Sequence, residues 1–306
     1  MDESVRITAE QIRKLQVQGA RNVALAAVKA LHSLAEITKA KTRKDFVKEL
    51  CEARNLLFAS RETEPLMRNA ISWIITQVED SDERNVTELT NLVCTSSQKF
   101  QKNLQVSKER IAEIGSKRIR DGSVIFTHCH SSTVTRMLQV ARNEGKNFEV
   151  ICTETRPAFQ GRITSKEMLA FGVKTTLIVD SAARSLINNA DIVVVGADAI
   201  TSEGNIVNKI GSSTIAVLAH EARKPFYVVS ELLKFDPATL CGGYEKIEER
   251  NRDEIWKEAP SELHIRNPAF DVTSRDLIHG LICEEGIISP HSVAEVMHRV
   301  YPWVFE

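Results

Sequence analysis

Short apolar runs, separated by stretches with helical spacing, dominate the sequence after Asp121-Gly122. Runs of this length, rich in valine and isoleucine, are typical of buried strands. Strands that alternate with helices form a parallel sheet, because each parallel connection needs a crossover that a helix can supply. We therefore predict a doubly wound, Rossmann-like sheet with helices near 131–144, 166–171, 181–188 and 213–223. Its predicted strands are 123–128, 148–154, 174–180, 191–197 and 224–231.

The part of the chain before this sheet has a different pattern. Between residues 8 and 120 the apolar residues recur at helical spacing, and the segment contains only two glycines, Gly19 and Gly115. This pattern predicts a bundle of helices. A chain of 306 residues is long enough for two separate cores. We predict an α/β protein with a helical N-terminal domain over 1–120 and a Rossmann-like, substrate-binding domain over 121–306.

The charge balance argues against a nucleic-acid partner. Forty basic and forty-one acidic side chains give a formal net charge of -1, whereas nucleic-acid-binding domains usually carry a basic excess. The densest cationic run, 39–54, is interrupted by acidic residues and is typical of a solvated helix face. The start of the chain lacks the pattern of a signal peptide, and no apolar run reaches transmembrane length. Since the six cysteines are scattered, we expect reduced thiols in a cytoplasmic protein without membrane partners.

The candidate chemistry lies where the predicted strands end, because open α/β sheets bind ligands at that edge. The run THCHSS, residues 127–132, ends the first strand and opens a helix. A helix N-terminus favours anions, so a phosphate could bind the Ser131-Ser132 turn, and Cys129 could have a lowered pKa and act as a base or nucleophile. A buried structural cysteine is the alternative. A zinc site at 128–130 is not favoured, because consecutive strand residues point to opposite faces; we predict no metal and no cofactor.

Asp198 follows the fourth predicted strand, where partial burial would raise its pKa and let it act as an acid. Its alternative role is to cap a turn. Asn208 and Lys209 precede a Gly-Ser-Ser helix start and form a second candidate phosphate cradle, although no Walker or GxGxxG pattern indicates nucleotide binding. Arg156 and Lys234 follow two other strands and add positive charge at this edge; for each, a surface ion pair is the alternative.

Several segments, taken in order and spacing, resemble those of one family. They are THCHSS, TETRPAFQGR, VDSAAR, GADAI, NKIG, the pair Lys234-Phe235 and RNPAFDVT. Over essentially its full length the chain is similar to the family that joins initiation factor 2B α, β and δ subunits, methylthioribose-1-phosphate isomerases and archaeal ribose-1,5-bisphosphate isomerases.

The resemblance implies an enzyme. The isomerases of the family have a cysteine and an aspartate at the positions matched by Cys129 and Asp198, whereas the translation-factor subunits generally lack that pair. The THCHS context and the KFDP segment look more like the enzymes that convert ribose 1,5-bisphosphate to ribulose 1,5-bisphosphate in archaeal nucleoside monophosphate degradation. A regulatory subunit of the translation-factor type and a methylthioribose-1-phosphate isomerase are the alternatives.

The resemblance also implies a phosphorylated sugar as the binding partner and a homo-oligomer, a dimer or a hexamer. This chain departs from the family pattern in three places: Gln18 replaces an arginine, Glu62 a proline and Ser132 a lysine. We expect Asp198 to protonate the sugar's ring oxygen while the Cys129 thiolate removes a proton from the adjacent carbon. The substrate contacts that the resemblance implies are Gly19, Ala20, Arg21, Arg61, His130, Ser131, Ser132, Asn208, Lys209 and Lys234.

Overall fold

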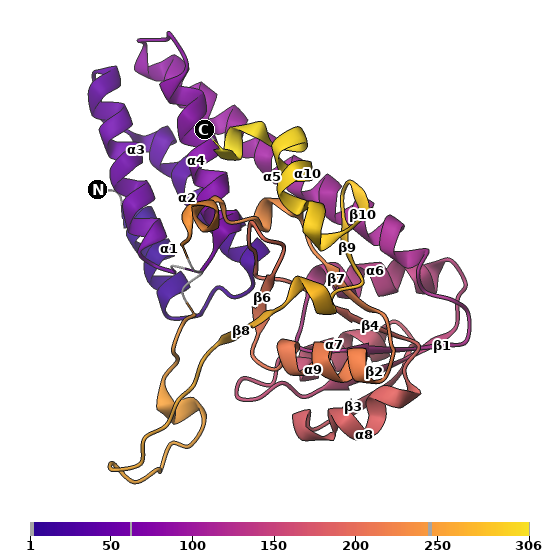
Figure 1. Ribbon diagram of the computed structural model, residues 1–306. Coiled ribbons are helices and arrows are strands. Elements are labelled where there is room, and N and C mark those ends of the chain that lie inside the picture. Colours follow the sequence, from indigo (N-terminus) through magenta and orange to yellow (C-terminus); the bar gives the residue numbers. More distant parts are fainter. Residues whose placement is uncertain (1–2, 62, 244–246, 306) are drawn as a thin grey trace. The chain divides into compact units, whose positions relative to one another are not determined.

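A computed structural model describes residues 3–61, 63–243 and 247–305 (Figure 1). The chain forms two compact units. A helical unit extends to Val106 and includes Leu233–Phe235 and the segment from His298 onward, and an α/β unit contains Ser107–Leu232 and Asp236–Met297. The division falls within the long helix α5, ahead of residue 120, where the sequence analysis placed the domain boundary. In the described ranges, no helix combines the length and apolar character that crossing a membrane requires.

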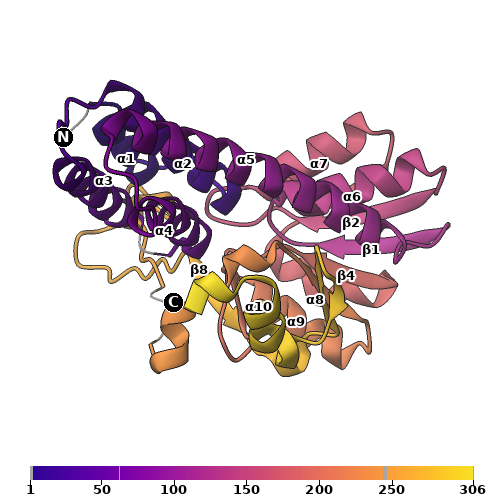
Figure 2. The ribbon, with the colours of Figure 1, turned by 90° about the horizontal axis from the view of Figure 1, so that it is seen from above.

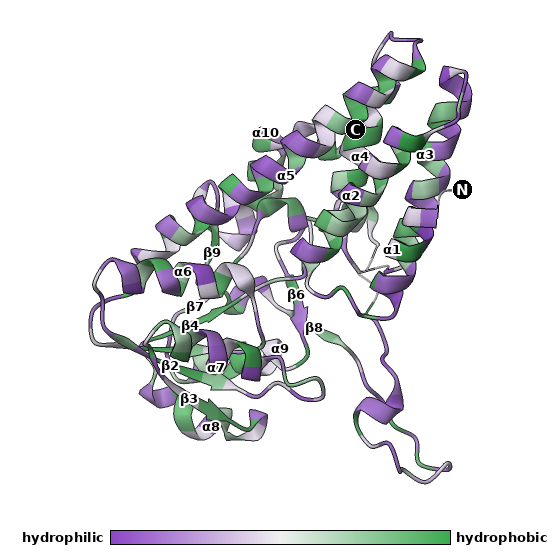
Figure 3. Cartoon of the chain, turned by 180° about the vertical axis from the view of Figure 1, so that it is seen from behind, coloured by the Kyte–Doolittle hydropathy of each residue, from purple (hydrophilic) through white to green (hydrophobic). Residues whose placement is uncertain are grey.

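The helical unit is built from amphipathic helices that bury one side against each other. In Figure 3, α5 carries apolar and polar residues in alternation along its length, as an amphipathic helix does. The Thr42 side chain accepts a hydrogen bond from the Asp45 backbone and begins α3, and Pro65 occupies the first turn of α4. The helices are α1 (Glu3–Arg13), α2 (Ala20–Ile37), α3 (Arg43–Phe58), α4 (Pro65–Glu79) and α5 (Val86–Ser116).

Two later segments of the chain return to this helical unit. The side-chain amide of Asn69 donates to the carbonyl oxygens of Leu233 and Phe235, at 2.9 and 2.8 Å. The Phe235 ring lies 5.6 Å from that of Phe305, centroid to centroid. Because Asn69 binds the residues on both sides of Lys234, that lysine belongs to the helical unit although it is distant in sequence.

The α/β unit contains the predicted parallel sheet, and the fold class is confirmed. Its strand order is β10-β9-β7-β4-β1-β2-β3, with only β10 antiparallel to its neighbour. The strands that the sequence predicted are β1 (Ser123–Thr127), β2 (Phe148–Thr153), β3 (Lys174–Ile178), β4 (Ile192–Val195) and β7 (Phe226–Val229). Two further strands, β9 (Gly280–Cys283) and β10 (Gly286–Ile288), extend one edge and were not predicted.

Helices cover both faces of this sheet, as a doubly wound fold requires. Figure 2 shows α6 and α7 on one side of it and α8, α9 and α10 on the other. Helix α7 begins earlier than predicted, at Gly161. Only a glycine fits at this position, because a Cβ would lie 1.7 Å from the Thr153 carbonyl oxygen. The helices are α6 (Ser132–Asn143), α7 (Gly161–Ala170), α8 (Ala183–Leu186), α9 (Ser212–Glu221) and α10 (Val293–Val300).

A small antiparallel sheet follows β4 and was also not predicted. Its order is β5 (Ala199–Ile200), β6 (Ile206–Lys209) and β8 (Phe270–Thr273), with Asn208 opposite Asp271 and Lys209 opposite Phe270. Two of the predicted substrate contacts, Asn208 and Lys209, belong to this sheet.

Candidate active site

Cys129, Asp198 and Lys209 approach one another at the carboxyl edge of the large sheet. Cys129 follows β1, and Asp198 follows β4, which is the neighbour of β1. The backbone N–H of Asp198 donates to the Val207 carbonyl oxygen at 2.9 Å, which places Asp198 beside β6, the strand that ends in Lys209. The charges of both Lys209 and Asp198 act on the Cys129 thiol. The α/β unit therefore brings together the predicted base, the predicted acid and a buried cation.

Gly196 permits the approach of these segments. A Cβ at this position would lie 2.8 Å from both Cβ and Oγ of Ser131, closer than side chains tolerate. The glycine in the sequence GAD thus allows the loop after β1 to pack against the end of β4, and it sets the spacing between Cys129 and Asp198.

Replacing Gly196 with alanine should push the loop that carries Cys129 and Ser131 away from β4. Because a displacement of about 1 Å near reacting groups can cost roughly a hundredfold in rate, we expect kcat to fall by about tenfold to a hundredfold. Urea unfolding measured in parallel separates this effect from lost stability. An unchanged kcat in a folded variant would show that the loop adapts without moving the reacting groups.

The backbone of Cys129 is held in a left-handed conformation, with φ at 65°. Such a conformation is costly for a residue other than glycine and needs support from its surroundings. The Cys129 N–H donates to Oγ1 of Thr155 at 2.9 Å, and its carbonyl accepts from Oγ1 of Thr164, also at 2.9 Å. The Asp180 carboxylate in turn accepts from the Thr155 N–H at 2.8 Å. Thr155, Thr164 and Asp180 thus position the cysteine.

The Cys129 thiol has a raised pKa, contrary to the expectation of a lowered one. Burial raises the pKa of the thiol to about 12. Lys209 and the His130 backbone N–H oppose this shift, whereas the negative charges of Asp198 and Asp180 add to it. Burial therefore outweighs the helix N-terminus, and in the ligand-free protein the thiol carries its proton at neutral pH.

His128 is a structural residue that links β1 to the segment after Lys209. Its Nε2 lies 2.8 Å from the Ile210 carbonyl oxygen, which can only accept, so this nitrogen carries the proton. Its Nδ1 accepts from the Thr153 hydroxyl at 2.6 Å. Burial lowers the pKa of His128, so the ring is neutral. A Cβ at Gly211 would lie 3.0 Å from this ring, which explains the glycine there.

The predicted contacts at the start of α6 lie together beside Cys129. Ser131 caps the helix by accepting from the Val134 N–H at 3.4 Å, and Ser132 is the first helical residue. His130 is partly buried, with Nδ1 3.2 Å from Oγ1 of Thr164 and Nε2 3.8 Å from Glu167. Burial lowers the pKa of His130, although Glu167 acts in the opposite direction. The first turn of α6 keeps the geometry of an anion site.

The second predicted phosphate cradle is wrong in one part. At the start of α9 the backbone N–H groups of Gly211 and Ser213 donate to the Asp271 carboxylate, at 2.7 and 3.1 Å. A carboxylate of the chain itself thus occupies the place proposed for a phosphate. Asn208 and Lys209 are both buried. The Asn208 amide donates to Oγ of Ser212 at 2.8 Å, and the Lys209 ammonium lies 5.4 Å from the Phe270 ring centroid.

The contact of Asp271 with the start of α9 makes the unfolding free energy of the protein depend on pH. Burial raises the pKa of Asp271 to about 6, although its two N–H donors act in the opposite direction. An unfolded aspartate titrates near 3.9, so between about pH 4 and pH 6 the folded chain holds the extra proton, and stability falls as pH rises. We expect the unfolding free energy of the wild type, relative to Asp271→Asn, to fall across this window and to be level above about pH 7. Urea unfolding of both proteins at a series of pH values checks this, and a level difference throughout would contradict it.

The other predicted contacts belong to the helical unit. Gly19, with φ at 84°, and Ala20 form the start of α2. The Arg21 guanidinium donates to the Leu104 carbonyl oxygen at 2.8 Å and to Oε1 of Gln105 at 2.7 Å. These two hydrogen bonds fix the orientation of the Arg21 guanidinium.

Arg61 forms an ion pair with Glu64 at 3.0 Å, and both side chains are buried. Of the positions that depart from the family pattern, Gln18 donates to the Leu15 carbonyl oxygen at 2.9 Å, and Glu62 lies outside the described residues. Arg156, which we expected to add positive charge at the sheet edge, donates to the Ile255 carbonyl oxygen at 3.1 Å. Substrate contacts by the residues of the helical unit stay predictions.

The residues that position Cys129 and the start of α9 were not predicted from the sequence. Thr155, Asp180 and Asp271 lie within the segments TETRPAFQGR, VDSAAR and RNPAFDVT, which carried the family resemblance but had no role assigned. Thr155 and Asp180 lie two residues beyond the ends of β2 and β3, which was the available signal, whereas Asp271 lies within β8. Their partners could not be read from the sequence, because each hydrogen bond joins segments that are distant along the chain.

The fold is that of a two-part α/β protein, with a doubly wound sheet and a helical unit. A thiol, a carboxylate and a buried lysine lie at the ligand-binding edge of the sheet, and these groups are suited to acid–base chemistry. The model of the Initiation factor 2 subunit family matches residues 16–290. The chain belongs to this family.

Two similar proteins are named ribose 1,5-bisphosphate isomerase. The one from Archaeoglobus fulgidus is 43% identical over 293 residues, covering 94% of this chain and 90% of the relative. The one from Pyrococcus furiosus is 37% identical over 305 residues, covering 97% and 94%. The solved structure described as the Pyrococcus horikoshii translation initiation factor eIF-2B matches with a TM-score of 0.83 and 29% identity, covering 95% of this chain and 98% of that one.

Proposed function

We propose that this protein is a sugar-phosphate isomerase that converts ribose 1,5-bisphosphate to ribulose 1,5-bisphosphate. The observation that carries the proposal is the placement of the partly buried Cys129 at the sheet edge, where the charges of both Asp198 and Lys209 act on its thiol. Aldose–ketose isomerisation needs one group that removes a proton from carbon and one that donates a proton to oxygen and accepts one from it. The names of the similar proteins supply the substrate, and the resemblance implies a role in nucleoside monophosphate degradation.

The substrate's anomeric carbon carries a phosphate ester, which constrains the route. Opening to a free aldehyde would expel that phosphate, so the ring must open by another path. Removal of the proton from C2 together with protonation of the ring oxygen breaks the bond between C1 and the ring oxygen. This forms a C1=C2 enol that still carries the phosphate on C1.

Cys129 and Asp198 can perform this step if the pair shares one proton. In the ligand-free protein the proton is on sulfur. Transfer from the thiol to the Asp198 carboxylate breaks an S–H bond, forms an O–H bond and leaves the charge of the pair unchanged. The pair then holds a thiolate base and a carboxylic acid, and Lys209 stabilises the thiolate.

The same two residues complete the reaction. After Asp198 has protonated the ring oxygen and Cys129 has taken the C2 proton, Cys129 returns that proton to C1, and Asp198 takes the proton of the C2 hydroxyl. The product has a ketone at C2 and a phosphate at each end, and both residues recover their starting states. The first turn of α6, with Ser131 and Ser132, is suited to one phosphate.

Substrate comparison tests this function. Purified protein should convert ribose 1,5-bisphosphate with a kcat/KM at least about tenfold above that for methylthioribose 1-phosphate, because a site built for a second phosphate loses those contacts with the methylthio group. A preference for methylthioribose 1-phosphate would assign the other isomerase activity. Turnover of neither substrate by the folded protein would reject the proposal and favour a regulatory subunit. The homo-oligomeric state stays a prediction.

A further inference from the structure

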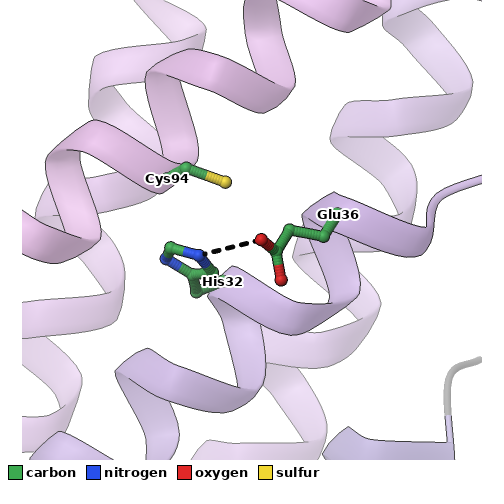
Figure 4. A group of neighbouring side chains, drawn as sticks. All are labelled: His32, Glu36 and Cys94. Atoms are coloured by element: carbon green, nitrogen blue, oxygen red, sulfur yellow. Dashed lines mark ion pairs between the residues drawn. The ribbon is translucent and has the colours of Figure 1, made fainter.

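A second group of reactive side chains lies in the helical unit, apart from the residues used above. His32 and Glu36 are four residues apart on α2 and therefore project from the same side of that helix. Cys94, on α5, reaches them from a second helix. One ligand atom of each residue lies within 4.8 Å of the other two. Figure 4 shows the thiol of Cys94 pointing toward the imidazole and the carboxylate.

The side chains of His32, Glu36 and Cys94 lie close together without a bound ligand. Nε2 of His32 lies 3.4 Å from Oε1 of Glu36, and these side chains are 20% and 58% exposed, so the group is open to solvent on the carboxylate side. Cys94 is partly buried. One helical turn before Cys94, the Thr90 hydroxyl donates to the Ala35 carbonyl oxygen at 3.3 Å, which holds α5 against α2 at this level.

We propose that His32, Glu36 and Cys94 form a binding site for a late first-row transition-metal ion, with Zn²⁺ as the ion it fits best. Imidazole nitrogen, thiolate sulfur and carboxylate oxygen are the donors that zinc prefers. Such donors lie about 2.0 to 2.3 Å from zinc, hence roughly 3.3 to 3.8 Å from one another in a tetrahedral site. The pair His32–Glu36 already has this separation, and small rotations of the Cys94 side chain complete the set.

Three protein ligands leave the fourth tetrahedral position to water. Binding replaces the thiol proton of Cys94 with the metal and releases that proton to solvent. An ion pair alone would explain His32 and Glu36, but exposed pairs of this kind contribute little to stability. It would not explain why a thiol points at the pair. The metal would join α2 to α5, and so we expect it to stabilise the helical unit by an amount that grows with the logarithm of the free-metal concentration above the Kd.

Cobalt spectroscopy of the full-length protein tests the site without relying on enzyme activity. After chelator treatment, added Co²⁺ should give a near-ultraviolet charge-transfer band from the thiolate to cobalt. It should also give the intense visible bands of a tetrahedral complex. One equivalent of Zn²⁺ should remove both sets of bands. Cys94→Ser should lose the charge-transfer band. Cys51→Ser is the matched control, since Cys51 is also a partly buried cysteine of the helical unit, and it should keep the band.

Alkylation mapping keeps the test decisive if Cys94→Ser does not fold. In the wild type, Zn²⁺ should slow the reaction of Cys94 with iodoacetamide at least about tenfold and leave Cys51 unchanged, as measured by peptide mass spectrometry. His32→Ala should abolish this protection. A charge-transfer band that persists in folded Cys94→Ser, or Cys94 alkylation that is unaffected by Zn²⁺, would overturn the proposal. Either result is independent of turnover with sugar phosphates.

Discussion

Replacing Cys129 with serine should lower kcat by about a hundredfold to ten-thousandfold, with substrate binding still measurable. A positioned acid or base typically contributes this factor. The serine hydroxyl fits the same space but cannot serve as a base of comparable strength. The change is measured by ketose formation under saturating substrate and by calorimetric titration of the variant with substrate. Cys241→Ser, which alters an exposed cysteine, is the matched control and should keep the wild-type kcat.

Asp198→Asn belongs to the same prediction, because the two residues are proposed to share one proton. The amide preserves size and hydrogen-bonding capacity but cannot pass a proton between sulfur and the ring oxygen. The double variant should therefore be little slower than the slower single variant, since residues that act as a unit give non-additive losses. Multiplicative losses would show that the two side chains act separately.

Replacing Lys209 with methionine should reduce the reactivity of Cys129 and the rate of isomerisation together. A nearby opposite charge typically lowers a pKa by about 1 to 3 units. Without the ammonium the pKa of the thiol rises, so the thiolate fraction at a fixed pH falls at least about tenfold. We expect the alkylation rate of Cys129 at pH 8 to fall by that factor. We expect kcat/KM to fall by about a hundredfold or more, because the variant also lacks a cation that we predict to contact a substrate phosphate.

Lys209→Arg separates the charge from the shape of the side chain. If charge is what matters, this variant should keep most of the Cys129 alkylation rate, although the larger guanidinium next to Phe270 will lower turnover. Equal alkylation rates in the wild type and Lys209→Met would show that Lys209 does not tune the thiol. Peptide mass spectrometry is needed for the readout, because the chain has six cysteines.

The large sheet was predictable because its central strands are continuous apolar runs. β4, with the sequence Ile-Val-Val-Val, is buried at every position, and such a run has few alternatives when turns and helical spacing flank it. Two of the strands that escaped prediction are very short. β10 has only three residues and begins with Gly286, and β5 has two. Their pairing depends on distant partners rather than on local pattern.

The site was predictable as a set of positions but not as an electrostatic environment. Topology alone places Cys129 and Asp198 at one sheet edge, since each directly follows a strand. The pKa shift of Cys129 was predicted in the wrong direction, because burial and the carboxylates of Asp198 and Asp180 outweigh the helix N-terminus. The occupation of the α9 start by Asp271 was likewise invisible, since that residue lies 60 positions from Gly211.

The most direct measurement of the central claim is a single-turnover reaction of the wild-type protein with ribose 1,5-bisphosphate labelled with carbon-13 at C2, followed by NMR. The account predicts that the labelled carbon moves from the sugar-ring region into the ketone region, and that stoichiometric Cys129→Ser moves it about a hundredfold to ten-thousandfold more slowly. A label that stays in the ring with folded wild-type protein, or that reaches the ketone equally fast with Cys129→Ser, would contradict the account.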